Sequence, residues 1–273
     1  MTDQPKILNY FRLLPQFIII GAQKAGTTSL YTYLTQHPNV RPAHQKEVHF
    51  FDLNFTQGLN WYRSNFSTRF RQISETLKGK PFITGESSPY YLLHPLVPQR
   101  VAKVLPQVKL IVLLRNPVDR AYSHYHHNRK MGRESLSFAD AIAAEPERLA
   151  GEREKILSDS TYNSFNYQHY SYLTRGFYLE QLQVWLEYFP RSQFLILHSE
   201  SLSQQPSEIF LKTLEFLNLS AWEPAAYYPY YRNEYDPIDA KMREELNGYF
   251  QEANQKLSEF LQQSWGINSL FSG

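Results

Sequence analysis

The sequence predicts an α/β protein in which a mostly parallel β-sheet is flanked by helices on both faces. Short apolar runs alternate along the chain with segments whose apolar residues recur at helical spacing, which is typical of this fold class. The first apolar run also passes through a glycine turn directly into a helix start, an arrangement that suits phosphate binding. The chain has 273 residues and no Pro/Gly/Ser-rich linker, so we expect residues 1–273 to form a single domain.

Four short apolar runs are the predicted strands, because turn residues bound them and they are too short to be helices. They are Phe17–Ile20, Phe82–Thr84, Lys109–Leu114 and Phe194–Leu197. Five longer segments carry apolar residues at helical spacing and are the predicted helices. They are Ser29–Gln36, Val118–Lys130, Gly176–Tyr188, Ser207–Leu217 and a C-terminal helix over about Asp239–Gln262, with Asp239 as its N-cap.

One polar segment fits neither pattern. Residues 143–160, AAEPERLAGEREKILSDS, are rich in charged side chains. We expect this segment to form a solvated helix or a mobile segment that covers a cleft.

The most informative stretch is Phe17–Thr28, FIIIGAQKAGTT, in which an apolar strand breaks at Gly21 and a hydroxyl-rich segment opens a helix. Such a turn directs backbone N–H groups and a helix dipole at a phosphate. The spacing nearly matches the nucleotide P-loop, G-x-x-x-x-G-K-[ST], but Thr27 replaces the lysine, which lies inside the loop as Lys24. We therefore predict a P-loop-type domain with an anion site at 21–29; the alternative is an ordinary strand-to-helix turn.

The predicted strand Lys109–Leu114 is followed by a basic residue rather than an acidic one. A P-loop NTPase would place an aspartate here to help hold magnesium, whereas this chain has Arg115. Arg115 and Ser123, on the following helix, would together bind one phosphate through a guanidinium fork and a hydroxyl. The alternative is a structural ion pair between Arg115 and Asp119. Two anion sites without a magnesium ligand favour an adenosine bisphosphate that carries a 5′ phosphosulfate and a 3′ phosphate.

These motifs resemble those of the sulfotransferases that use 3′-phosphoadenosine 5′-phosphosulfate (PAPS), and most closely the heparan sulfate sulfotransferase branch and its bacterial relatives. The segment IIGAQKAGTTSL is similar to the family's phosphosulfate loop, and LLRNPVDRAYSHY is similar to its 3′-phosphate motif, here 115–123. The resemblance implies cofactor contacts from Gly21, Gln23, Lys24, Ala25, Gly26, Thr27, Thr28, Ser29, Arg115 and Ser123.

A third matching segment, KEVHFFD, carries the expected catalytic base. In the heparan sulfate branch the glutamate of this segment takes that role, which the resemblance transfers to Glu47. Lys24 would neutralise charge on the departing phosphate oxygen, and His49 lies two residues after Glu47, on the same side of an extended segment. For Glu47 the alternative is a surface ion pair with Lys46.

The role of His49 is left open by the sequence. His49 orients Glu47 or the acceptor, acts as the base itself, or packs as an aromatic beside Phe50 and Phe51. Asp52 either braces His49 or caps the loop that follows.

Two further segments depart from the family pattern. The Golgi members have a cysteine-bridged basic loop before the last helix, whereas the corresponding stretch here, Tyr227–Asp239, contains no cysteine and one basic residue, Arg232. We assign Arg232 to the 3′ phosphate on this basis. Ser87 follows Glu86 where glycan-modifying members often have lysine, which weighs against a highly anionic glycan as acceptor.

Composition excludes other classes. The 28 basic and 26 acidic residues give a net charge of +2, too balanced for a general nucleic-acid or membrane-surface binder. The absence of cysteine excludes disulfides and thiolate metal sites. Three histidines share one helix without a carboxylate as third ligand, so we predict no metal; they are His124, His126 and His127. Because no signal peptide or membrane span is evident, we expect a cytoplasmic location without stable membrane insertion.

The sequence therefore predicts a PAPS-dependent sulfotransferase that modifies a hydroxyl or amine of a saccharide or small molecule and releases adenosine 3′,5′-bisphosphate. Two alternatives stand beside this prediction. One is a P-loop-like phosphotransferase or kinase, which would need magnesium and ATP. The other is a catalytically silent nucleotide-binding protein. No oligomeric state is predicted.

Overall fold

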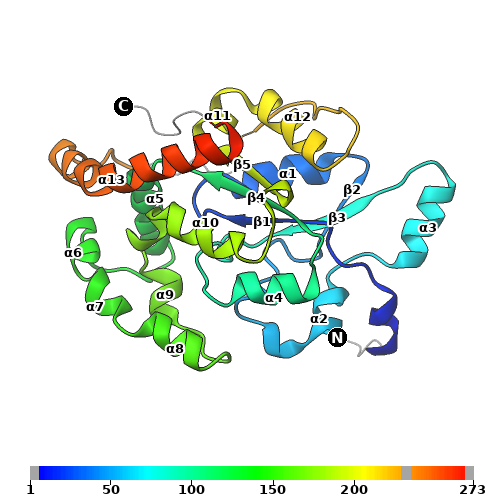
Figure 1. The fold of residues 1–273 in the computed structure, drawn as a ribbon, viewed down its shortest axis with the longest axis horizontal. Coiled ribbons are helices and arrows are strands. Elements are labelled where there is room, and N and C mark those ends of the chain that lie inside the picture. The colour runs from blue at the N-terminus through cyan, green and yellow to red at the C-terminus, as the bar shows by residue number, and fades with distance from the viewer. Residues whose placement is uncertain (1–5, 229–234, 268–273) are drawn as a thin grey trace.

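The computed structural model describes residues 6–228 and 235–267, which build a five-stranded parallel sheet in the order β2-β3-β1-β4-β5 (Figure 1). The strands are β1 Phe17–Gly21, β2 Val40–Pro42, β3 Ile83–Ser87, β4 Lys109–Leu114 and β5 Phe194–His198. The four predicted strands are thus confirmed, although the second begins at Ile83 rather than Phe82 and runs on to Ser87 rather than ending at Thr84. The sequence pattern missed β2 because it has three residues, of which only Val40 is buried.

The sheet is buried on both faces, as continuous apolar strands require. Helices α1 (Thr27–Gln36) and α12 (Pro206–Phe216) cover one face, and α4 (Val97–Val104) and α10 (Tyr178–Leu186) cover the other (Figure 1). Every residue of β1 is buried, and each large apolar side chain of this kind contributes roughly 1.5–3 kcal/mol on burial. The predicted fold class, with helices on both faces of a mostly parallel sheet, is therefore confirmed.

Two long helices frame one end of the sheet. Helix α5 (Pro117–Lys130) follows β4, and the C-terminal helix α13 (Ala240–Trp265) packs against α5 and α10. The side chain of Asp239 accepts a hydrogen bond from Met242 N at 3.0 Å, so the predicted N-cap of α13 is confirmed. The helix runs three residues beyond its predicted end.

The remaining helices are short. They are η1 Lys6–Phe11, η2 Phe55–Gln57, α2 Leu59–Ser64, α3 Arg69–Leu77, α6 Phe138–Ala143, α7 Glu145–Leu149, α8 Glu152–Ser158, α9 Phe165–His169, η3 Thr174–Gly176, η4 Arg191–Gln193 and α11 Ser199–Gln204. Helices α6 to α9 lie together at one end of the molecule, and α3 projects at the opposite end (Figure 1).

The polar segment 143–160 is held in place rather than solvated throughout. It forms α7 and α8, and each begins with a buried glutamate. The Glu145 carboxylate accepts hydrogen bonds from Leu173 N at 2.7 Å and Thr174 N at 2.8 Å. Glu152 accepts from Tyr162 Oη at 2.7 Å. The segment is thus helical and mostly exposed, as the prediction of a solvated helix has it, while its buried carboxylates require hydrogen-bond partners that fasten it to the protein.

The fold brings the predicted motifs to one edge. Strand β1 lies between β3 and β4, so the chain segments that leave these three strands emerge side by side at the carboxyl edge of the sheet. The chain turns in opposite directions on the two sides of β1, and such a switch point is the usual ligand site of a parallel sheet.

Candidate active site

The loop after β1 is shaped to hold an anion. Gly26 is the N-cap of α1 with φ of 88°, a left-handed conformation that favours glycine. Among the described residues, no side chain caps α1 and no acid lies in its first turn, so its N–H groups can serve a ligand. Gln23, Lys24 and Thr28 are half-buried. The other predicted hydroxyls of this loop, Thr27 and Ser29, are buried.

The two predicted anion motifs meet in the structure. Arg115, which follows β4, donates from Nη1 to the carbonyl of Lys24 at 3.0 Å. Asp119 instead pairs with Arg243 Nη2 of α13 at 2.7 Å, so the alternative of an Arg115–Asp119 ion pair is not what forms. Ser123 lies on the same helix, α5, and is buried. Arg232 lies outside the described residues.

Lys24 is in an environment that disfavours its charge. Burial lowers the pKa of Lys24, and the nearby cations Arg115 and Lys46 lower it further, to about 8. A buried cation beside other cations is stabilised by a bound anion, because a nearby opposite charge favours its charged form.

Glu47, His49 and Asp52 form a row of hydrogen-bonded side chains. His49 Nε2 lies 3.1 Å from Glu47 Oε2, and His49 Nδ1 lies 2.7 Å from Asp52 Oδ2. Asp52 is buried and also accepts from Leu53 N at 2.6 Å, so it both braces His49 and caps the next turn. The interpretation of His49 as a packed aromatic was wrong. Lys46 Nζ lies 3.9 Å from Glu47 Oε1, so the alternative ion pair also forms.

Contacts within this row raise the pKa of His49 and lower that of Glu47. Burial opposes charge on His49, but its hydrogen bonds and attraction to Asp52 and Glu47 outweigh burial and raise its pKa to about 10. Burial likewise opposes charge on Glu47, yet the hydrogen bond and charge of His49, with Lys46, hold its pKa below the ordinary value. At neutral pH His49 is therefore a charged imidazolium beside the ionised carboxylate of Glu47, which is half-exposed.

Another buried carboxylate, that of Glu86, is linked to this row through hydrogen bonds. Glu86, near the end of β3, accepts from Tyr62 Oη at 2.5 Å and from Ser88 Oγ at 2.8 Å. Burial raises its pKa to about 7, although these hydrogen bonds lower it in part. Ser88 Oγ in turn accepts from His49 N at 3.2 Å. Glu86 thus supports, through Ser88, the backbone of the segment that carries Glu47 and His49, a role that the sequence did not predict.

Arg175 was also missed from the sequence. This buried arginine donates from Nη1 to Gln23 Oε1 at 2.7 Å and from Nε to Ser171 Oγ at 2.7 Å, and its guanidinium lies 4.9 Å from the centre of the Tyr90 ring. Because arginine only donates, it fixes the Gln23 amide with its oxygen toward Arg175. The NH₂ group of Gln23 is then the part that can face an anion.

The turn after Arg175 joins the other anion motif. A side chain at Gly176 would meet Phe250 of α13 at 2.6 Å and Pro117 of α5 at 2.9 Å, so only glycine permits this close packing. Tyr178 Oη donates to the carbonyl of Arg115 at 2.8 Å. The segment 175–178 therefore contacts both the loop after β1, through Gln23, and the motif after β4, through Arg115, and it holds the two at a fixed separation.

The histidines of α5 have separate surroundings. His124 is fully buried, and its ring lies 5.0 Å from that of Tyr172. His126 stacks on Tyr235 with ring centres 4.2 Å apart. Within residues 6–228 and 235–267, no group of three or more His, Asp or Glu side chains is arranged to hold a metal ion.

The parallel sheet, the loop after its central strand and the Glu47–His49–Asp52 row at the same edge are the features of an α/β protein of the P-loop-like class. The model of the sulfotransferase domain matches residues 14–260. The chain therefore belongs to the sulfotransferase family.

Individual relatives agree with this assignment. The chain is 34% identical over 80% of its length to heparan sulfate glucosamine 3-O-sulfotransferase 3B1 of Mus musculus, and 26% identical over 91% to the membrane-associated sulfotransferase kil1 of Dictyostelium discoideum. The matches span 51% and 65% of those two proteins. A sulfotransferase structure from Alicyclobacillus acidocaldarius is 29% identical, with a TM-score of 0.68 over 92% of this chain and 96% of that one.

Proposed function

We propose that this protein transfers a sulfuryl group from PAPS to a hydroxyl or amine of a saccharide or small molecule, with Glu47 as general base. The observation that carries the proposal is the Glu47–His49–Asp52 row at the sheet edge where Lys24 and Arg115 meet. A proton acceptor beside a pair of cations suits the transfer of an anionic group to an acceptor that must lose a proton.

The residues present fit the proposed donor. Its 5′ phosphosulfate would be held by Lys24 and the rest of loop 21–29 and by the N–H groups at the start of α1, whose first turn contains no acidic residue. Its 3′ phosphate would be held by Arg115 and Ser123, with Arg232 as a further proposed contact. When bound, the donor supplies an activated sulfuryl group. No metal enters the proposal, because β4 leads into Arg115 rather than a carboxylate.

Each catalytic side chain has a stated task. Glu47 takes the acceptor proton as the new bond forms, which contributes about 10²–10⁴-fold in such reactions. His49, held by Asp52, orients the Glu47 carboxylate and keeps it ionised. Lys24 neutralises the charge that develops on the departing phosphate oxygen. This arrangement favours the orienting role for His49 over that of base, because a charged imidazolium cannot accept a proton.

Two observations bear on the acceptor class: the names of the relatives, and the residue at position 87. The mouse relative is named for a heparan sulfate glucosamine acceptor, which supports a saccharide. Ser87 is buried and uncharged at the position where glycan-modifying members often carry lysine, which favours a less anionic acceptor. The kinase alternative finds no support, since the strand end that would hold magnesium carries Arg115. We keep a cytoplasmic location and the lack of a nucleic-acid partner as part of the proposal, on the balanced charge of the chain.

Nucleotide binding tests the donor. The protein should bind adenosine 3′,5′-bisphosphate far more tightly than ATP, and equally well with and without EDTA, because the site offers two separate anion positions. Isothermal calorimetry measures both affinities, and an acceptor screen with labelled PAPS then identifies the product. Tighter binding of ATP that depends on magnesium would refute the proposal.

A single variant provides the control for this measurement. Arg115→Ala should weaken binding of the 3′-phosphorylated nucleotide by about 1.5–3 kcal/mol, the range for a charged hydrogen bond, and should hardly affect adenosine 5′-phosphate. An equal loss for both nucleotides would mean that Arg115 acts only through its structural bond to Lys24.

Arg175 should act as a positioning residue for Gln23. Arg175→Met and Gln23→Ala are each expected to weaken adenosine 3′,5′-bisphosphate binding roughly ten-fold, the value of one hydrogen bond to a charged group. The double variant should bind no more weakly than the worse single variant, because residues in one network are not additive. Additive losses, or a fall in melting temperature without coupling, would show that Arg175 only stabilises the fold.

A further inference from the structure

A surface far from the site has the features of a membrane contact. Helix α3 (Arg69–Leu77) projects at one end of the molecule (Figure 1), and none of its nine described residues is buried. Its apolar side chains Phe70, Ile73 and Leu77 recur at helical spacing and therefore share one face. They are 57% to 84% exposed. The opposite side of the helix is fastened to the protein through Gln72 Nε2, which donates to the carbonyl of Phe82 at 3.1 Å.

The N-terminal helix η1 extends this apolar face. Tyr10 and Phe11 are also strongly exposed, and the Phe11 and Phe70 rings lie 5.6 Å apart. A β-bridge between Arg12 and Thr68 holds the two helices together. Five of the twelve strongly exposed large apolar side chains among the described residues thus belong to one surface, which we call the α3 face. Such concentration marks an interaction site rather than the usual scatter.

Charge is concentrated at the same place. Residues 61–80 contain five Lys or Arg and one Glu, a net charge of +4 in a chain whose total is +2, so the rest of the chain sums to −2. The acid, Glu75, is already paired with Lys78 at 3.1 Å. The exposed cations of this segment are Arg69, Arg71, Lys78 and Lys80.

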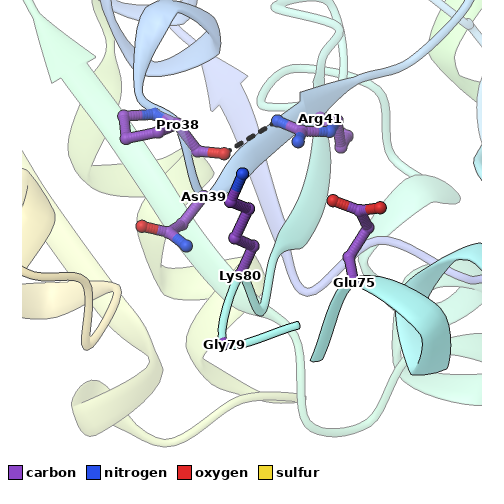
Figure 2. A pocket seen from close by; sticks show the side chains of 6 residues that line it. All are labelled: Pro38, Asn39, Arg41, Glu75, Gly79 and Lys80. Carbon is purple, nitrogen blue, oxygen red and sulfur yellow. Dashed lines mark hydrogen bonds between the residues drawn. The ribbon is translucent and has the colours of Figure 1, made fainter. Parts of the chain in front are cut away.

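A hollow beside α3 adds further polar groups. It has a volume of about 480 Å³ and lies at the amino edge of the sheet, where Pro38 and Asn39 precede β2 and Lys80 precedes β3. Figure 2 shows Arg41 and Lys80 at this hollow, with the Glu75 carboxylate near Arg41. Two cations at the rim of a shallow hollow suit a phosphate group that approaches from the surface.

We infer that the α3 face docks the protein on an anionic phospholipid surface, with the apolar side chains at the headgroup boundary and the cations on lipid phosphates. Apolar side chains flanked by Lys and Arg on a short surface helix are the features of interfacial binding. A symmetric pairing of two copies through this face would instead bring two +4 segments together, which repulsion opposes.

The geometry leaves the catalytic edge accessible. The α3 face lies at the amino edge of the sheet, whereas loop 21–29 and the Glu47 row lie at the carboxyl edge. The docked protein would therefore present its site away from the lipid. This inference does not rest on the proposed sulfuryl transfer, since no residue of the α3 face belongs to the site.

Vesicle flotation tests the inference. The full chain should float with vesicles that contain phosphatidylglycerol and stay behind with vesicles of phosphatidylcholine alone, and added salt should release it. Leu77→Glu should weaken binding roughly ten-fold or more, because it removes buried apolar area. The double variant Arg69→Gln, Arg71→Gln should weaken it about five-fold for each cation removed.

Matched controls separate the face from general charge and hydrophobicity. Leu157→Glu removes an exposed leucine on α8, and Lys241→Gln with Lys256→Gln removes two exposed cations on α13; both should leave flotation unchanged. Equal binding to the two vesicle types, or equal losses in the controls, would overturn the inference. Two other results would also overturn it. One is a dimer, detected by light scattering, that the Leu77→Glu variant no longer forms; the other is binding to an acidic protein without any binding to lipid.

Discussion

Glu47→Gln is expected to lower kcat by ~10²-fold or more while nucleotide affinity stays nearly unchanged. The glutamine keeps the shape of the side chain and its contact with His49, but it cannot accept a proton near neutral pH. The measurement is single-turnover kinetics on the identified acceptor, together with calorimetry of adenosine 3′,5′-bisphosphate. Glu75→Gln, which removes a surface carboxylate at the amino edge, is the matched control and should retain wild-type turnover.

The pH profile gives an independent check of the same role. Because His49 and Lys46 hold the pKa of Glu47 below its ordinary value, the carboxylate stays ionised as the pH falls. The acidic limb of kcat should therefore lie below the usual glutamate range. His49, with a pKa of about 10, loses its charge only as the pH rises through that value. If Glu47→Gln keeps near wild-type turnover, the base lies elsewhere and His49 is the first side chain to replace.

Lys24→Ala is expected to impair binding and chemistry together. The lysine would contact the phosphosulfate in the ground state and stabilise more charge in the transition state. We expect a loss of about 1.5–3 kcal/mol in nucleotide affinity and a further fall of roughly 10²-fold or more in kcat. Lys46→Ala, which removes the neighbouring half-exposed lysine, should have a much smaller effect on both quantities.

The depressed pKa of Lys24 adds a pH dependence with a definite sign. Its pKa of about 8 means that the free protein carries the charge below that pH and loses it above. Wild-type affinity for adenosine 3′,5′-bisphosphate should therefore fall as the pH rises through about 8, whereas Lys24→Ala should show no such decline. An unchanged wild-type affinity across this range would mean that Lys24 does not contact the nucleotide.

The sequence predicted four of the five strands and the fold class because these depend on neighbouring residues. Apolar runs and helical spacing reveal burial on one face of a strand or helix. The strand β2 was missed because three residues carry too little pattern. The burial of the glutamates that begin α7 and α8 was missed because their partners are distant in sequence. Glu145, for example, accepts hydrogen bonds from Leu173 N and Thr174 N, nearly thirty residues away.

The residues that support the site lie beyond such local patterns. Gln23 and Arg175 are 152 residues apart, and Lys24 and Arg115 are 91 apart. The sequence around Arg175 and Glu86 does not indicate which distant side chains these two residues contact. Only the parallel sheet, which gathers the ends of β1, β3 and β4, brings these partners within hydrogen-bond distance.

The sequence by itself thus determined the fold class and the family, because loop chemistry and periodicity depend on consecutive residues. The tertiary structure decided the protonation states of the charged side chains at the site and the contacts that orient them. His49 is charged at neutral pH because Asp52 and Glu47 both hydrogen-bond to its ring, and the pKa of Lys24 is lowered because the side chain is buried and lies near Arg115 and Lys46. Charges interact through space, so a pKa is a property of the folded neighbourhood and not of the chain segment.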